Sequence, residues 1–143
     1  MRAVARVMVG VVVLAASTVV SVTAQSPEEP APGEARAGVV FTYPLESPAG
    51  QQVTGVLVEY GPGGASRPHH HTMRGSVVAY VLEGAVRSRV NGGPVTVYEV
   101  GESWVEPPGA AHSVSENASS TEPARVLAVF VAEVGAELTT FDP

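Results

Sequence analysis

Apolar and polar residues alternate along much of the chain after residue 38, which is the pattern of strands with one buried face. Several segments share this alternation or form short apolar runs: residues 53–60, 77–83, 86–90, 95–100, 103–106 and 126–134. No segment repeats its apolar residues about every 3.6 positions, as an amphipathic helix would. The pattern therefore predicts an all-β fold.

Glycine, proline and asparagine separate these segments. Asn91 and Gly92 directly follow the alternating residues 86–90, and an Asn-Gly pair in this position is a strong hairpin signal. Further turns are indicated at residues 61–64 and 107–109. Many short strands with such turns predict a single domain built as a sandwich or a closed barrel.

The first 24 residues have the features of a secretory signal peptide. Arg2 and Arg6 supply positive charge, residues 7–16 form an almost unbroken apolar run, and small residues precede Gln25. We therefore expect residues 1–24 to be a signal peptide and the protein to be periplasmic or secreted. An uncleaved N-terminal anchor is the alternative, because the lengths of the two kinds of apolar segment overlap.

Residues 25–38 are rich in proline and glutamate, as in Pro27, Glu28, Glu29 and Pro30. A segment of this composition buries little apolar surface and is typical of a flexible linker. We expect a disordered linker over residues 25–38 and a folded barrel domain over residues 39–143.

Composition and charge exclude several classes of function. The whole chain has 143 residues, no cysteine and a net charge of −6. Cleavage of the signal peptide would leave the exported chain more acidic still, because Arg2 and Arg6 would be removed. An acidic chain lacks the basic surface that nucleic acid or an anionic membrane requires, so neither partner is expected. Disulfide bonds and thiolate chemistry are excluded as well.

The four histidines of the chain lie in two short segments. If residues 69–71 form a strand, His69 and His71 point to the same face, about 6.6 Å apart along it, while His70 points away. His112 follows a Pro-Pro-Gly turn, where another strand would begin. A barrel that brings the two strands together would form a three-histidine metal site with open positions, as catalytic metals have.

Two spaced motifs contain these histidines. The first is Gly63-x5-His69-x-His71, which continues to Gly84 through the sequence Tyr-Val-Leu-Glu-Gly. The second spans residues 101–117 and reads Gly-x5-Pro-x-Gly-x2-His-x4-Asn. In this order and spacing, the chain resembles a small single-domain cupin of the quercetinase-like kind. The resemblance covers roughly residues 39–134. It implies a double-stranded β-helix, or jelly-roll, barrel with His69, His71 and His112 as metal ligands.

The chain departs from the cupin motifs at two positions. The glutamate that usually supplies a fourth ligand in the first motif is missing, since its place falls on Gly75, Ser76 or Val77, depending on the direction of counting. The asparagine of the second motif is displaced by one residue, with Glu116 in its place and Asn117 after it. The resemblance then implies a three-histidine site without the usual carboxylate.

Other side chains are weaker candidates. Glu106 could replace the missing carboxylate or act as an acid or base, but the favoured interpretation is a solvated glutamate at a strand end. Tyr80 faces the cavity only if the missing glutamate position is Ser76, and Trp104 lines the pocket or packs in the core. Arg87 and Arg89 could bind an anion together, although a solvated strand face is the simpler interpretation.

The resemblance implies an exported metal-binding protein that uses Fe, Mn, Ni or Zn. A metal-dependent dioxygenase acting on a small organic molecule is the first expectation, and a lyase or isomerase with a Lewis-acid metal is the second. The alternative is a non-catalytic module that binds or senses a small ligand or a metal. The resemblance leaves the oligomeric state open, with a homodimer that pairs through its sheets as one alternative. We expect no stable membrane association once the signal peptide is removed.

The signal peptide can be tested on exported protein. N-terminal sequencing and intact-mass measurement should identify Gln25 as the first residue, since signal peptidase cleaves after small residues such as Ala24. Recovery of the full-length chain from the membrane fraction would show that the segment is an anchor.

Overall fold

The computed structural model describes residues 28–143, so the expected signal peptide and the first residues of the expected linker lie outside the described chain. The described residues form strands and connecting loops, and none of them is helical. The prediction of an all-β fold is therefore confirmed. The strands in chain order are β1 (Ala35–Pro44), β2 (Gln51–Tyr60), β3 (His69–His71), β4 (Gly75–Glu83), β5 (Ala85–Val90), β6 (Thr96–Glu99), β7 (Ser103–Glu106), β8 (Ala111–Asn117), β9 (Ala124–Glu133) and β10 (Thr139–Phe141).

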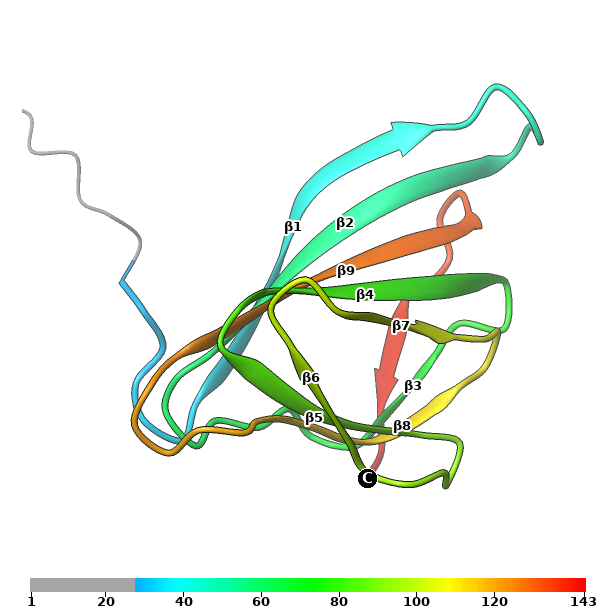
Figure 1. Cartoon of the computed structure of the whole chain (residues 1–143). Helices are drawn as coiled ribbons and strands as arrows, with labels where there is room; N and C mark the ends of the chain where they lie inside the picture. The colour runs from blue at the N-terminus through cyan, green and yellow to red at the C-terminus, as the bar shows by residue number, and fades with distance from the viewer. Residues whose placement is uncertain (1–27) are drawn as a thin grey trace, which may run out of the picture.

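Two five-stranded antiparallel sheets make up the fold. One has the order β1-β2-β9-β4-β7 and the other the order β10-β3-β8-β5-β6. Figure 1 shows the first sheet above the second, with the chain crossing between them several times. Strands far apart in sequence become neighbours in this way, as β9 does between β2 and β4. This is the jelly-roll barrel that the sequence predicts. Within the described residues, no helix is long and apolar enough to cross a membrane.

The first strand starts before the expected domain boundary at residue 39. Ala35 already pairs with Tyr60 of β2. The preceding turn is tied to the same region, because the Gly33 amide donates to the Pro62 carbonyl at 2.9 Å and the Gly61 amide donates to the Glu34 carbonyl at 3.0 Å. Composition indicated a linker here, but backbone pairing needs no apolar side chains. The ordered structure therefore includes the second half of the Pro- and Glu-rich segment.

The core lies between the two sheets and follows the alternation in β4. Val77, Ala79 and Val81 of this strand are buried, whereas Val78 and Tyr80 are exposed. The buried members of the main cluster come from both sheets: Tyr60, Ala79, Val81, Val86, Trp104, Ala124 and Val126. Burial of such side chains contributes about 1.5–3 kcal/mol for each large one.

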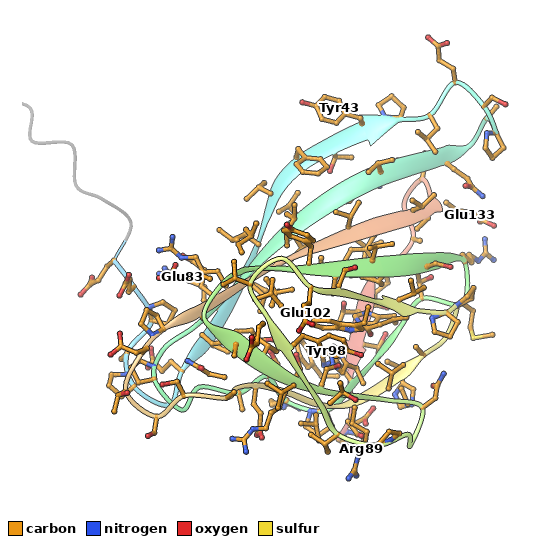
Figure 2. The ribbon with its side chains drawn as sticks, viewed as in Figure 1. Tyr43, Glu83, Arg89, Tyr98, Glu102 and Glu133 are labelled. Carbon is orange, nitrogen blue, oxygen red and sulfur yellow. The ribbon has the colours of Figure 1, made fainter. Side chains whose placement is uncertain are left out.

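The outer surface of the first sheet is also apolar. Tyr43, Val78, Tyr80, Val105 and Val131 are all exposed, and Figure 2 shows Tyr43 on the outside of β1. Extended exposed apolar surface of this kind often marks a contact between proteins. The homodimer stays a prediction, and this face is the one that it would bury.

Candidate metal centre

The three histidines predicted as ligands meet inside the barrel. His69 of β3 pairs directly with His112 of β8, so their side chains share one face of the second sheet. His69 and His71 are buried, whereas His70 between them is exposed, with its Nδ1 at 2.7 Å from a carboxylate oxygen of Asp142. The strand alternation therefore separates His70 from the other three.

The three buried imidazoles are close enough to share one ion. The ring centroids of His69 and His71 are 4.9 Å apart, and those of His69 and His112 are 5.0 Å apart. Each residue offers one ligand nitrogen, and these nitrogens all lie within 4.8 Å of one another. A divalent transition metal binds imidazole nitrogens at about 2.0–2.1 Å, so small side-chain adjustments would bring all three within reach.

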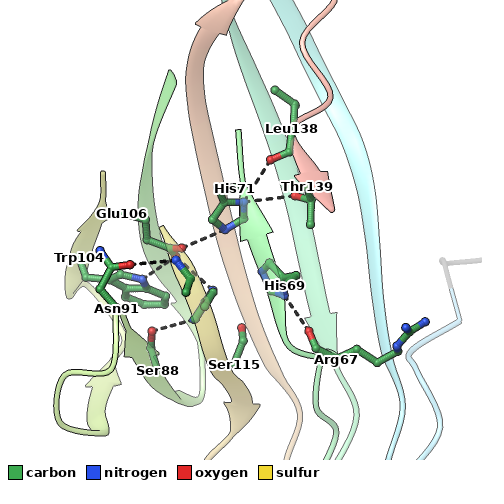
Figure 3. A network of polar contacts seen from close by, with 12 residues as sticks. Arg67, His69, His71, Ser88, Asn91, Trp104, Glu106, Ser115, Leu138 and Thr139 are labelled. Carbon is green, nitrogen blue, oxygen red and sulfur yellow. Dashed lines mark hydrogen bonds and ion pairs between the residues drawn. The ribbon is translucent and has the colours of Figure 1, made fainter. Parts of the chain in front are cut away.

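Backbone carbonyls orient the rings of His69 and His71. Nδ1 of His69 lies 2.7 Å from the Arg67 carbonyl, and Nδ1 of His71 lies 3.2 Å from the Leu138 carbonyl, as Figure 3 shows. A carbonyl oxygen only accepts, so Nδ1 must donate in each ring. In the neutral imidazoles, Nε2 is then left with a free lone pair, which is the form that binds metal.

His112 is held with the opposite orientation. Its Nε2 lies 2.9 Å from the Ser88 hydroxyl, so Nδ1 is the nitrogen directed toward the other side chains of the site. Sequence analysis did not identify Ser88. Its alternation with Arg87 and Arg89 indicated an inward position, but nothing in the sequence pointed to its partner.

Glu106 is buried, so the favoured prediction of a solvated glutamate at a strand end is wrong. It is only 2 % exposed, because β7 directs it into the barrel. One carboxylate oxygen, Oε2, lies 2.9 Å from Nε2 of His71, and Oε1 lies 3.4 Å from Nδ1 of His112. The Trp104 indole donates to Oε1 at 2.9 Å. Trp104 and Glu106 are two residues apart in one strand, so their side chains point to the same face. Since tryptophan is usually buried, this spacing was the signal in the sequence that Glu106 is buried too.

Tyr80 is not part of the site. It is 44 % exposed on the outer face of the first sheet, because the inward positions of β4 are odd-numbered. Arg87 forms a surface ion pair with Glu116 at 3.1 Å, and neither Arg87 nor Arg89 lines the cavity. Trp104 does line it. The weak candidates thus divide into two that face the cavity, Glu106 and Trp104, and three that do not.

A cavity of about 110 Å³ extends from the histidines. Most of its lining is apolar and includes Val56, Val126 and Phe130. Its polar lining includes the Tyr60 and Ser115 hydroxyls, which are 2.6 Å apart and share a hydrogen bond. Burial raises the pKa of Tyr60, so this phenol stays protonated.

Burial and close contacts shift the pKa values of His69, His112 and Glu106 in the directions that favour binding of a cation. Burial lowers the pKa of His112 to about 4 and also lowers the pKa of His69. Burial alone would raise the pKa of Glu106, but its close contact with His71 and the nearby His112 outweigh this effect and hold that pKa below its ordinary value. At neutral pH the site therefore presents neutral imidazole at His69 and His112 beside an ionised carboxylate. This donor set fits a divalent transition metal.

Comparison with known proteins identifies the fold family. The family described as "Cupin domain" matches residues 56–130, which is more than half of the chain. The chain belongs to the cupin family. The two motifs that suggested this membership contain the three buried histidines, and the matched region includes all of them. No match to a curated protein was found.

Solved structures support the same fold at low sequence identity. An uncharacterised conserved protein with a double-stranded β-helix domain from Klebsiella pneumoniae is 21% identical with a TM-score of 0.62, over 80% of this chain and 90% of the other. Oxalate oxidase in complex with the substrate analogue glycolate is 22% identical with a TM-score of 0.61, over 82% of this cupin and 59% of the oxidase. KdgF from Halomonas sp. is 21% identical with a TM-score of 0.55, over 78% and 86% of the two chains.

The lowered histidine pKa values give a testable dependence on pH. In the unfolded chain His112 takes up a proton near its ordinary pKa of 6.5, whereas in the folded protein it does so only near pH 4. Between these values the unfolded state binds more protons, so the free energy of unfolding decreases as the pH falls, by at most about 1.4 kcal/mol per pH unit for one group. Urea unfolding of metal-free protein from pH 7 to pH 4 measures this slope.

The variant His112→Gln should show a shallower slope than the wild type. His70→Gln removes an exposed imidazole and serves as the matched control. Equal slopes for the wild type and His112→Gln would contradict the lowered pKa of His112.

Proposed function

We propose that this cupin is a metal-dependent oxygenase that acts on a small organic molecule inside the barrel. The observation that carries the proposal is the cluster of three buried imidazoles, whose ligand nitrogens lie within 4.8 Å of one another and face the cavity. His69, His71 and His112 are the proposed ligands. The proposed metal for oxygenase chemistry is Fe(II), Mn(II) or Ni(II), which occur with imidazole or mixed nitrogen and oxygen ligands. Zn(II) fits the same ligands but has no redox chemistry, so it would support only a lyase, an isomerase or a non-catalytic protein.

A redox-active ion held in this way would supply open coordination positions at which oxygen and an organic substrate meet. The residues around the proposed metal orient its ligands and set the polarity of the cavity. The carbonyls of Arg67 and Leu138 keep two imidazoles in the metal-binding tautomer. The apolar part of the lining, which includes Trp104 and Phe130, lowers the local polarity and so strengthens electrostatic interactions there.

The cavity also restricts the substrate. It holds about 110 Å³, somewhat less than the engineered cavity of about 150 Å³ that binds benzene in another protein. Glu106 is the only acidic residue in its lining, and no arginine of the described chain lines it. Apart from the metal, the lining offers an anionic substrate no positive side chain, and Glu106 would offset part of the metal charge. The proposed substrate is therefore small and uncharged, with a polar group that can reach the metal or the hydroxyls of Tyr60 and Ser115.

We further propose that the protein works outside the cytoplasm, as residues 1–24 would direct. The charged start, the apolar run and the small residues before Gln25 support export. Absence of cysteine is compatible with an oxidising compartment, because no thiol of this chain can be oxidised there.

Four alanine variants test the ligand assignment. His69→Ala, His71→Ala and His112→Ala should each lose most of the bound metal, because two ligands remain in place of three. His70→Ala should keep it, since His70 points out of the barrel. Metal content after dialysis, measured by elemental analysis, distinguishes these outcomes.

Thermal stability should follow the same order. An ion that binds only the folded state stabilises it by RT ln(1 + [L]/Kd), or about 2.7 kcal/mol at 100 times Kd. A chelator should therefore lower the melting temperature of the wild type and of His70→Ala but leave the other three variants unchanged. Loss of metal from His70→Ala as complete as that from His71→Ala would refute the proposed ligand set.

Oxygen consumption separates catalysis from simple binding. Metal-loaded protein should consume oxygen with at least one member of a panel of small uncharged phenols and ketones, and the three ligand variants should not. If the metal binds as proposed but no substrate supports oxygen consumption, the oxygenase proposal is wrong, and the alternatives are a lyase or isomerase with a Lewis-acid metal and a non-catalytic cupin that binds a metal or a small ligand.

A further inference from the structure

Two neighbouring strands place a valine and a glutamate side by side in the wall of the barrel. Val77 of β4 is directly opposite Glu106 of β7, and both are almost completely buried, at 1 % and 2 % exposed. Side chains of directly opposite residues have Cβ atoms about 4.5–5.5 Å apart and share one face of the sheet. A group carried by either residue therefore reaches nearly the same region of the barrel interior.

Val77 is the position where the cupin motif has its missing glutamate. Sequence counting left Gly75, Ser76 and Val77 open. Ser76 has the parity of the exposed residues Val78 and Tyr80, so its side chain is directed outward. At Gly75, a Cβ atom would lie 2.4 Å from the Val131 carbonyl oxygen, so no side chain fits there. The inward position with room for a side chain is Val77.

The carboxylate of Glu106 is incompletely satisfied in this structure. Trp104 donates to Oε1, but Oε2 is buried and accepts no hydrogen bond of good geometry. Nε2 of His71 lies 2.9 Å from Oε2. Because Nδ1 of that ring faces the Leu138 carbonyl, Nε2 is the ring nitrogen directed at the carboxylate oxygen. A metal ion beside these two atoms would be within reach of both.

We infer that Glu106 is the fourth metal ligand and that this cupin carries its ligand carboxylate on β7 in place of β4. The inference rests on the proposed three-histidine site and extends it by one residue. A carboxylate balances part of the metal charge. It suits Mn(II), which prefers oxygen ligands, and non-haem Fe(II) sites commonly combine histidines with a carboxylate. It also accounts for a buried acid that the two histidine motifs do not require.

The first test removes the charge of the carboxylate with little change of shape. Glu106→Gln should weaken Zn(II) and Co(II) binding by at least about 10-fold in competition with a chelator, since even outer-shell partners of metal ligands contribute about 10–100-fold. The visible absorption spectrum of the Co(II) form should change, because it reports the number and type of ligands. Glu46→Gln makes the same chemical change on an exposed loop and should leave affinity and spectrum unchanged.

The second test moves the carboxylate back across the strand pair. Glu106→Val should lose metal affinity as Glu106→Gln does. The double variant Glu106→Val with Val77→Glu should regain affinity and a four-ligand Co(II) spectrum, because the two positions face the same region. Circular dichroism and thermal melting of each variant show that the barrel is folded, so a lost site is not confused with a lost fold.

The outcomes separate this inference from the proposed function. If Glu106→Gln keeps wild-type metal affinity and the wild-type Co(II) spectrum, Glu106 is not a ligand, although the three-histidine site can stand. If that variant also loses oxygen consumption, Glu106 acts on the substrate as an acid or base, which equally overturns the inference. If the wild type and His70→Ala bind no metal, the proposed function itself fails. A double variant that folds but stays as weak as Glu106→Val would refute the shared position.

Discussion

The short pairing between β3 and β8 is the constraint on which the candidate site depends. β3 contains only three residues, and its register with β8 sets His69 directly against His112. A slip by one residue would turn every side chain of the moved strand to the other face of the sheet. His71 and His112 would then no longer share the cavity. The strand β10 holds the other edge of β3, pairing Thr139 with His71, so the register is fixed from both sides.

Burial gives the same groups their chemical character and has a cost in stability. Removing His112 and Glu106 from water disfavours their charged forms, and only partners within the barrel offset this for the carboxylate. An ion pair buried without a further partner contributes little to stability. Such a cluster persists because the apolar residues around it contribute the folding free energy, while the cluster itself is preorganised to hold a cation. The apolar residues thus stabilise the barrel and the polar cluster forms the site. Low sequence identity to solved structures of the same fold is consistent with these separate roles, since one barrel accommodates different sites.

Local alternation explains which features could be predicted from the sequence. The strands, the turn at Asn91 and the opposite directions of His70 and His71 follow from a period of two, which needs no knowledge of distant partners. The position of Glu106 depends on the pairing of β7 with β4, and its partners come from three different strands. A single sequence does not reveal such long-range pairing. Tyr80 was undecided for a related reason, because the missing motif glutamate had three possible positions until the burial of Val77 was known.

The attachment of β3 also affects the order in which the protein folds. Both strands that hold it are distant in sequence, and the contact between His71 and Leu138 spans 67 residues. Closing loops of this length is slow compared with forming hairpins such as β1–β2 or β5–β6. Loop closure over this distance favours late assembly of the three imidazoles, after the local hairpins. A metal ion would then enter a nearly finished protein, and its identity would be set by the ions available in the compartment where folding ends.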